Sequence, residues 1–122
     1  MNGTQIVKIL KKAREKVSQG WIQGRGQNET GTQVCAAHAI TQSVRVENGI
    51  SRWSSTLEEQ DLVNDQTEIV GQLLLAAATE QTDLAWFSIP AWNDYSSRTQ
   101  TEVLDTFDHA IKTAERDMED AS

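Results

Sequence analysis

The sequence predicts a mainly α-helical protein, a single small domain of about four helices joined by loops. The chain has 122 residues, which is enough to bury one core and too few for two independent cores. Apolar residues recur at helical spacing along four separate segments, which is typical of amphipathic helices. Residue types that start or end helices stand at the boundaries of these segments. The prediction is therefore one domain over residues 1–122.

The first helix is expected over residues 4–19. Thr4 is of a residue type that caps helix starts, and Gly20 is placed to end the helix. The apolar residues that repeat at helical spacing are Ile6, Leu10, Ala13 and Val17. Residues 20–31 then contain four glycines among polar residues, a composition that favours a loop or a short irregular hairpin.

Two more helices are expected over residues 34–46 and 57–80. The first begins with a patch of small residues, which permits close packing of another helix. Asn48 and Gly49 mark the turn after it, and two glutamates suit the first turn of the next helix. That next helix is the most apolar and is expected at the centre of the fold. Its apolar residues are Leu62, Val63, Ile69, Val70, Leu73, Leu74 and Ala77.

Residues 83–98 are expected to form an ordered aromatic loop. The aromatic residues of this segment do not follow a helical period; they are Trp86, Phe87, Trp92 and Tyr95. Pro90 disfavours helical geometry at Ile89 before it. Several residues here and around residues 21–34 favour extended structure, so short strands can form in both loops.

The last helix is expected over residues 99–118. Thr99 and Glu102 match the capping-box pattern, in which each side chain accepts a hydrogen bond from the backbone amide of the other residue. The stripe expected to be buried consists of Val103, Leu104, Phe107, Ala110, Ile111 and Ala114. The charged residues 115–122 are expected to fray as an acidic tail.

Charge and cysteine content exclude several classes of protein. The formal net charge of −7 argues against general nucleic-acid binding, which needs a basic face toward phosphate. The longest apolar run, residues 73–78, is well short of a membrane span, and the N-terminus lacks the apolar stretch of a signal peptide. We therefore expect a cytoplasmic protein without membrane contact. Cys35 is the only cysteine, which excludes an internal disulfide.

The charges are unevenly spread along the chain. Basic residues crowd the first segment, and acidic residues dominate the last. Such opposite ends attract each other either within one chain or between two chains, and the second case predicts a homo-oligomer.

The candidate ligand site lies just before the last helix, where helix amides favour an anion. Arg98, expected to be exposed, would add a bidentate contact to a phosphate or carboxylate. The glycine-rich segment offers a second wall with an indole and an arginine. The expected ligand-binding residues are Trp21, Arg25, Trp92, Asn93, Tyr95, Arg98 and Thr99. A purely structural interpretation stays open, in which Thr99 only caps the helix and Trp92 closes the core.

Two other groups of residues are less favoured candidates for a catalytic or metal site. Cys35 and His38 fall one helical turn apart, which suits a nucleophile with its base or two metal ligands, but a buried cysteine and a structural histidine explain them more simply. Glu102, Asp105 and His109 share one helix face, which suits a divalent ion or, more simply, a solvated acidic surface. Because no phosphate-binding glycine motif or metal set is present, we predict no cofactor and no metal.

Four segments, taken in order, carry a resemblance to known proteins: GW at 20–21, CAAHAI at 35–40, IPAWND at 89–94 and RTQTEVLDTFDHAI at 98–111. The sequence resembles a family of small proteins of unknown function found in actinobacteria and in phages. The resemblance implies a helical architecture and a phage or bacterial origin, but no reaction. By analogy, small phage proteins often act by binding, either to a nucleotide signal of host immunity or to a host protein.

The favoured function is non-enzymatic binding of a small anionic, nucleotide-like ligand, by which the protein would sequester a host immune signal. The alternative is a protein-interaction module that binds or inhibits a host protein. A small hydrolase using His38 or His109 ranks last, because no complete set of nucleophile, base and orienting group can be named.

Overall fold

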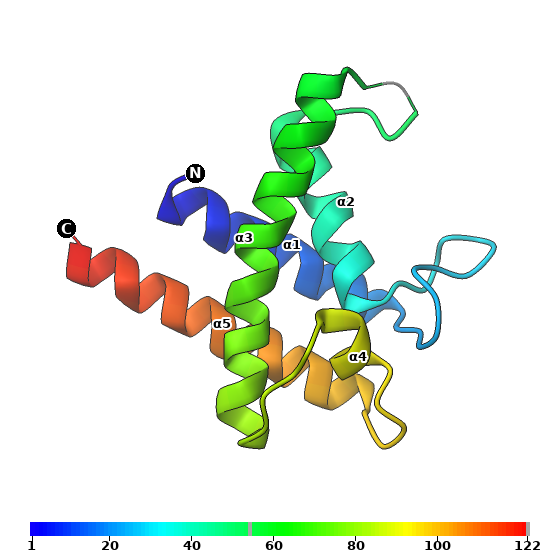
Figure 1. The fold of residues 1–122 in the computed structure, drawn as a ribbon, viewed down its shortest axis with the longest axis vertical. Helices are drawn as coiled ribbons and strands as arrows, with labels where there is room; N and C mark the ends of the chain where they lie inside the picture. The colour runs from blue at the N-terminus through cyan, green and yellow to red at the C-terminus, as the bar shows by residue number, and fades with distance from the viewer. Residues whose placement is uncertain (54, 122) are drawn as a thin grey trace.

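Helices dominate the structure. The computed structural model describes residues 1–53 and 55–121, at residue 121 for the backbone alone. The helices are α1 (Gly3–Gln19), α2 (Ala36–Asn48), α3 (Leu57–Thr82), α4 (Ile89–Asn93) and α5 (Gln100–Ala121), shown in Figure 1. The predicted mainly α-helical fold is confirmed. Val34 forms isolated bridges with Trp21 and Gln27, but no strand forms among the described residues, so the short strands that both loops allow are absent there.

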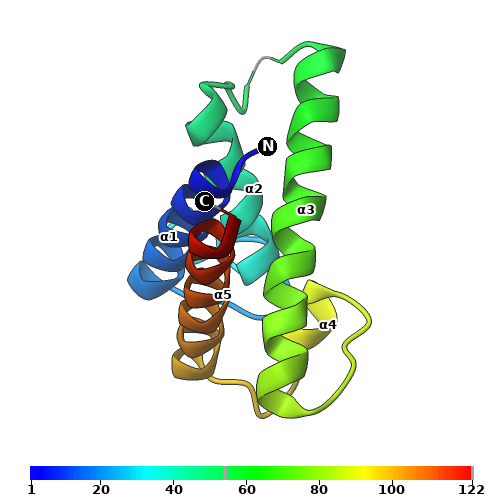
Figure 2. The same ribbon diagram turned by 90° about the vertical axis from the view of Figure 1, so that its left-hand side faces the viewer.

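The long helices pack around α1. Helices α1 and α5 lie side by side and run in opposite directions, so that residues near both chain ends meet at one side of the molecule (Figures 1 and 2). Helix α2 packs on α1, and α3 crosses the group as the longest helix, in contact with α2 and α5. The short helix α4 contacts α2 and α3 near the start of α2.

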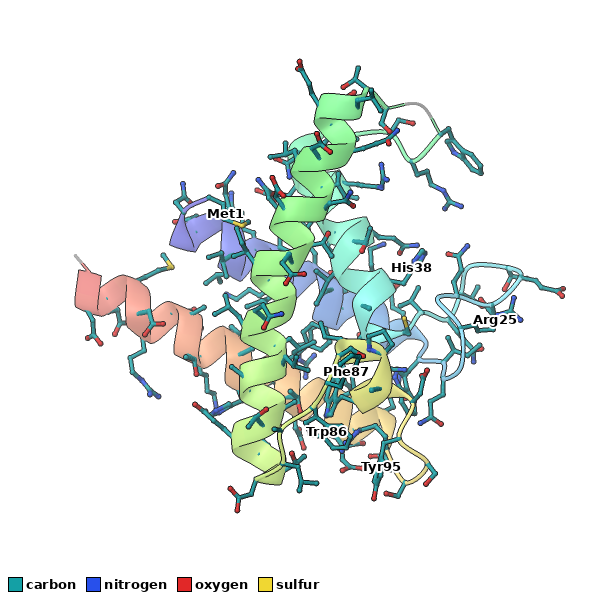
Figure 3. The ribbon with its side chains drawn as sticks, viewed as in Figure 1. Met1, Arg25, His38, Trp86, Phe87 and Tyr95 are labelled. Carbon is teal, nitrogen blue, oxygen red and sulfur yellow. The ribbon has the colours of Figure 1, made fainter. Side chains whose placement is uncertain are left out.

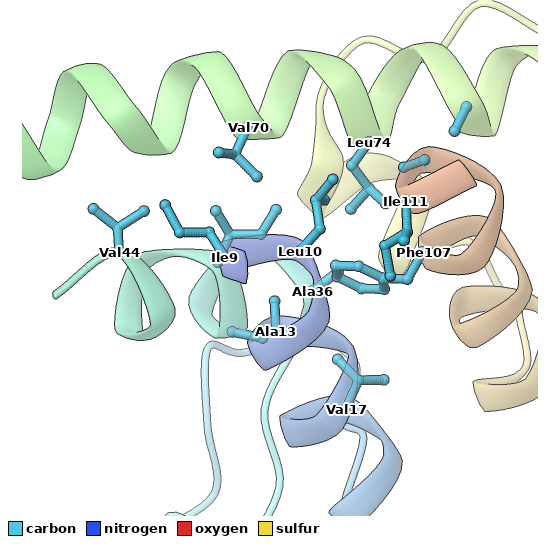
Figure 4. Close-up of a cluster of buried hydrophobic side chains, with 14 of the residues drawn as sticks. Ile9, Leu10, Ala13, Val17, Ala36, Val44, Val70, Leu74, Phe107 and Ile111 are labelled. Carbon is cyan, nitrogen blue, oxygen red and sulfur yellow. The ribbon is translucent and has the colours of Figure 1, made fainter. Parts of the chain in front are cut away.

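The core contains side chains from each of the four long helices. Figure 4 shows several of these side chains meeting beneath α3, and the largest fully buried ones are Trp92, Phe107, Ile9, Leu10, Ile40, Leu74, Val17, Val44, Val63, Val70, Val103 and Asn93. All of these except Asn93 are apolar, and burial of apolar side chains is the main favourable contribution to the free energy of folding. Trp92 therefore closes the core, as the structural interpretation of the aromatic loop expected.

Caps set the helix boundaries, and one predicted cap is wrong. Helix α1 is capped by Asn2, not Thr4: the Asn2 side chain accepts from the amide of Gln5 at 2.9 Å, and the Gln5 side chain accepts from the amide of Asn2 at 3.1 Å. This reciprocal pair satisfies two amides at once, so the helix begins before Thr4. Gly20 ends α1, as predicted.

The second and third helices keep their predicted places with small shifts. Helix α2 begins two residues later than predicted because Cys35 is its cap, and it ends at Gly49, whose φ of 66° lies in the left-handed region. Helix α3 begins at Leu57 as predicted, because Thr56 and Glu59 form a capping box in front of it.

The aromatic loop, residues 83–98, contains a short helix that the sequence analysis missed. Pro90 was expected to keep Ile89 out of helical geometry, but α4 begins at Ile89, and the Ser88 hydroxyl accepts from the amide of Ala91 at 3.2 Å. Proline is tolerated in the first turn of a helix because the amide it lacks has no partner within the helix there. The expectation at Ile89 was therefore wrong.

The basic start and the acidic end of the chain meet within one molecule. Arg14 donates to both carboxylate oxygens of Asp108, at 2.6 and 3.2 Å, and the Lys11 ammonium lies 3.7 Å from Glu115. These pairs link α1 to α5 along their exposed side. Helical geometry continues to Ala121, and the fraying of residues 115–122 stays a prediction. No helix within the described residues is long and apolar enough to cross a membrane.

Candidate functional site

Asn93 joins the two predicted walls of the ligand site. Its side chain is fully buried, and its Oδ1 accepts from the indole Nε1 of Trp21 at 2.8 Å and from the backbone amide of Ala36 at 3.0 Å. Its Nδ2 donates to the carbonyl of Ile22 at 3.1 Å and to Asp94 Oδ1 at 2.9 Å. The Asn93 amide is thus occupied by the protein itself and holds residues 20–35, which we call the glycine loop, against α4.

Further hydrogen bonds close the space between the two loops. The Gln23 side chain donates to the carbonyls of Asn93 and Tyr95, at 3.0 and 2.8 Å, and the amide of Gly24 donates to Asp94 at 2.9 Å. Two of these contacts are made to the backbone carbonyls of Asn93 and Tyr95, two of the expected ligand-binding residues. The glycine loop is therefore pinned to the aromatic loop by polar contacts along much of its first half.

Arg98 is buried, although it was expected to be exposed. Only 8% of it is accessible; its Nε donates to the carbonyl of Trp92 at 3.0 Å and its Nη1 to Glu102 at 3.2 Å. Its guanidinium carbon lies 5.0 Å from the ring centre of Trp86, 5.3 Å from that of Trp92 and 5.5 Å from that of Tyr95. A planar, weakly hydrated cation stacks well on aromatic rings, which explains how an arginine is tolerated here.

Thr99 forms the predicted capping box at the start of α5. Its backbone amide donates to the Glu102 carboxylate at 3.0 Å, and its hydroxyl accepts from the amide of Glu102 at 3.2 Å. Glu102 therefore serves both Thr99 and the guanidinium of Arg98. The structure brings most of the predicted residues into one cluster, in which the Glu102 carboxylate already pairs with the Arg98 cation. The predicted residues in it are Trp21, Trp92, Asn93, Tyr95, Arg98 and Thr99.

Arg25 lies apart from that cluster, exposed on the glycine loop (Figure 3). It lines a hollow of about 390 Å³ with Cys35, His38, Thr41 and Asp94 among its neighbours. No described residue forms a hydrogen bond or ion pair with the Arg25 side chain. This hollow is the part of the predicted site that stays open to solvent.

Cys35 and His38 do not form a catalytic pair in this hollow. The thiol accepts from the backbone amide of His38 at 3.3 Å, and burial raises the pKa of Cys35. A thiol with a raised pKa stays protonated and is a poor nucleophile. Burial lowers the pKa of His38, and the positive charges of Arg52 and Lys16 lower it further. The imidazole therefore favours its neutral form.

A second hollow, of about 330 Å³, opens where α1, α2 and the glycine loop meet. Three cations line it, Lys16 from the last turn of α1, Arg45 from α2 and Arg52 from the loop after α2. The remaining lining residues are uncharged: Gln27, Thr30, Gly31, Gln42, Val46 and Ile50. Among the described residues no carboxylate lines this space, which we call the basic hollow.

The walls of the basic hollow are held in place by the protein. Gln42 on α2 donates to Gln27 of the glycine loop at 3.2 Å, and Arg45 donates to the carbonyl of Ser51 at 3.2 Å. The guanidinium carbon of Arg52 lies 4.5 Å from the ring centre of Trp53. No carboxylate in the described part of the chain pairs with Lys16. At least one cation of the hollow is therefore uncompensated by the protein.

The sequence analysis did not single out these cations as a site. Arg45 follows Gln42 by three positions on α2, so the two share a helix face. That spacing is the one local signal for the hollow. Lys16 and Arg52 arrive there from other elements, so only the packing of those elements brings them together.

A third hollow, of about 540 Å³, lies between α3 and the aromatic loop. Gly71 and Leu75 line its α3 side, Ile89 and Pro90 its opposite side, and Phe87 stands on its rim with 96% of its surface exposed. Figure 3 shows Phe87 beside α4 on the face toward the viewer. Such exposure is unusual for a phenylalanine.

The acidic face of α5 does not gather a metal site. Glu102 is engaged by Arg98 and Thr99, and His109 pairs with Glu80 of α3. Among the described residues, no group of three or more histidine, cysteine, aspartate or glutamate side chains is placed to hold a metal ion.

Comparison with known proteins yields a family and no activity. The sequence matches a family of unknown function (DUF6197) over residues 1–113. No curated protein and no solved structure is similar enough to the chain to count as a match.

Proposed function

The chain belongs to DUF6197, a family of unknown function, and we propose from the site alone that it binds a small anionic ligand in the basic hollow without converting it. The observation that carries the proposal is the convergence of Lys16, Arg45 and Arg52 on one concave space that no described carboxylate lines. On a chain with a net charge of −7, such a local excess of positive charge is the exception.

The chemistry of the hollow suits an anion with several oxygens. The guanidinium fork of Arg45 or Arg52 can donate two parallel hydrogen bonds to a phosphate or carboxylate, and the Lys16 ammonium adds a point charge. Gln27, Gln42 and Thr30 offer neutral polar groups beside them. The volume of about 330 Å³ falls within the range of small-ligand sites.

The positive charges of Lys16 and Arg52 also act beyond the basic hollow. His38 lies outside the basic hollow, in the hollow around Arg25, and the charges of Arg52 and Lys16 still help to lower its pKa. Their field therefore extends along α2 and favours an anion arriving from either hollow. Arg25 adds a further exposed cation in the hollow that contains His38.

Binding is favoured over catalysis by the state of the nearby reactive groups. The Cys35 thiol has a raised pKa and accepts its hydrogen bond from a backbone amide, not from an imidazole. A protein that holds an anion without converting it can act by sequestration. Withdrawal of a host signal by a phage-encoded protein is such an action and remains part of the proposal. Arg98 is buried and paired with Glu102, so we assign the anion to the basic hollow and not to Arg98.

Titration calorimetry with pyrophosphate tests the proposal. Lys16→Gln removes a hollow cation that forms no described ion pair, so the fold should persist, while the affinity should fall about ten-fold, the usual effect of one lost charged hydrogen bond. Lys112→Gln, at an exposed position of α5, is the matched control and should bind as the wild type does. Absence of pyrophosphate binding by the wild type, or equal affinity of the two variants, would refute the proposal.

A protein-interaction role is the second candidate, and Phe87 is the observation that favours it. An aromatic side chain that is 96% exposed beside a 540 Å³ hollow is the kind of anchor that dominates binding at protein interfaces. Leu84, also exposed in the same loop, would widen such a contact. Phe87→Ser should abolish binding to a host protein under this second proposal and leave pyrophosphate binding unchanged.

A further inference from the structure

Trp53 is an exposed tryptophan beside the basic hollow. It is 83% exposed, whereas Trp92 is fully buried and the indole nitrogens of Trp21 and Trp86 donate to Asn93 and Thr82. The core therefore gains little from Trp53. A flat indole that does not serve packing is available to stack on a planar partner.

The loop that carries Trp53 is tied to the wall of the basic hollow. The amide of Ile50 donates to the carbonyl of Arg45 at 2.9 Å, and the Arg45 side chain donates to the carbonyl of Ser51. The amide of Trp53 in turn donates to the Ser51 hydroxyl at 3.1 Å. Arg52 connects the basic hollow to Trp53, because it lines the hollow and its guanidinium lies over the Trp53 ring. The indole thus stands at the edge of the cationic surface.

From this arrangement we infer that the ligand class is a free nucleotide, whose phosphates occupy the basic hollow while its base stacks on Trp53. The inference rests on the proposed function, because it names the ligand of the same hollow. A base is a flat aromatic group joined to phosphate through a sugar, and an indole beside a cluster of cations offers a matching surface for both ends. Stacking tolerates any base, so the inference does not select among them.

A free nucleotide fits this surface better than a nucleic-acid strand. Binding a strand requires cations that follow several successive phosphates. Here the cations converge on one hollow, and the rest of the chain carries an excess of negative charge. A short single-stranded oligonucleotide therefore serves as a comparison ligand, and it should bind more weakly than the mononucleotide.

Calorimetry with two probes tests the inference. ADP carries the base and two phosphates, and pyrophosphate carries the phosphates alone. The wild type should bind ADP about ten-fold more tightly than pyrophosphate, the lower end of what one stacked base contributes. Trp53→Ala should remove this advantage, so that ADP and pyrophosphate bind it with similar affinity, whereas Trp53→Phe, which keeps an aromatic ring, should retain part of it. Lys16→Gln should weaken both probes.

Each outcome bears on a different claim. Equal binding of ADP and pyrophosphate, or an ADP advantage that survives in Trp53→Ala, overturns the nucleotide inference and leaves the anion proposal standing. An oligonucleotide that binds more tightly than ADP overturns the choice of a free nucleotide. If the wild type binds neither small probe, the proposed function fails, and the inference fails with it.

Discussion

The indole nitrogen of Trp21 lies 2.8 Å from the side-chain oxygen of Asn93, although 72 positions separate the two residues in the sequence. The same oxygen accepts from the first amide of α2, at Ala36. One buried amide group therefore fixes the glycine loop, the start of α2 and the end of α4 relative to one another. Residues of this glycine loop line two hollows of the molecule.

Asn93→Ala should destabilise the protein by about 3 kcal/mol. The change leaves the buried amide of Ala36 and the indole N–H of Trp21 without their acceptor, and an unsatisfied buried donor costs about 1–3 kcal/mol. Urea denaturation followed by circular dichroism gives the free energy of unfolding. Asn28→Ala is the matched control: its side chain also accepts from a backbone amide, at Gln33, but in an exposed loop. Equal losses in both variants would contradict the assigned role of Asn93.

Arg98→Ala should cost about 2–3 kcal/mol of stability. The substitution removes a hydrogen bond from a charged donor to the Trp92 carbonyl and leaves a space between Trp86, Trp92 and Tyr95. Arg116→Ala, at an exposed position of α5, should change stability by less than about 0.5 kcal/mol. Thermal melting compares the two. An Arg98→Ala protein as stable as Arg116→Ala would show that the buried cation is not structural.

Gly20→Ala should be far more harmful than Gly49→Ala. A Cβ at position 20 would lie 2.1 Å from the backbone oxygen of Thr32, and backbone cannot move aside as a flexible side chain can. We expect a loss of about 3 kcal/mol, the upper end of the cost of overpacking. Gly49 has a φ of 66° but open space around it, so alanine there pays only the left-handed backbone cost of about 1 kcal/mol. Similar melting temperatures for the two variants would refute the clash.

Thr99→Ala should lower stability by about 1 kcal/mol through loss of the cap on α5. The hydroxyl accepts from the amide of Glu102, and no other described side chain takes over that amide. Thr101→Ala is the natural control, because Thr101 is exposed in the same first turn and alanine is the better helix former. It should leave stability unchanged or raise it slightly. A loss of the same size at both positions would mean that the cap contributes nothing specific.

Features controlled by neighbours in the sequence were predictable. The capping box of Thr99 and Glu102, the start of α3 at Leu57 and the end of α1 at Gly20 each depend on residues within one helical turn. The cap at Asn2 and the short helix at Ile89 follow equally local rules, but competing local signals, Thr4 as a capping residue and the restriction on the residue before Pro90, pointed to other boundaries.

The candidate site could not be predicted in the same way. Arg98 is buried because three aromatic rings and a carbonyl from the preceding loop surround it, and only the folded loop shows that environment. The basic hollow needs Lys16, Arg45 and Arg52 to converge from three elements, which depends on the glycine loop resting on α2. Spacing in the sequence predicts which side chains share one helix face. It does not predict which side chains from different elements lie together.

His38 should make stability depend on pH. Burial, together with the charges of Arg52 and Lys16, lowers its pKa in the folded state below the ordinary value of 6.5. Between the folded pKa and about pH 6.5 the unfolded chain binds a proton at this residue and the folded chain does not, so stability rises with pH across that window. The contribution of neutral His38 to the free energy of unfolding is fully present above about pH 6.5. It is lost as the pH falls through the folded pKa.

His38→Gln should therefore show a smaller loss of unfolding free energy between pH 7.5 and pH 5.5 than the wild type, with carboxylate titrations common to both proteins. Urea denaturation in phosphate-free buffer measures this difference, and identical losses would show that His38 does not titrate differently on folding.

The same experiment links His38 to the basic hollow. An anion bound there would offset the charges of Arg52 and Lys16, raise the pKa of His38 and reduce the pH dependence of the wild type. Pyrophosphate should then narrow the gap between wild type and His38→Gln, and about ten-fold more pyrophosphate should be needed for the same effect once Lys16→Gln has removed a cation of the hollow.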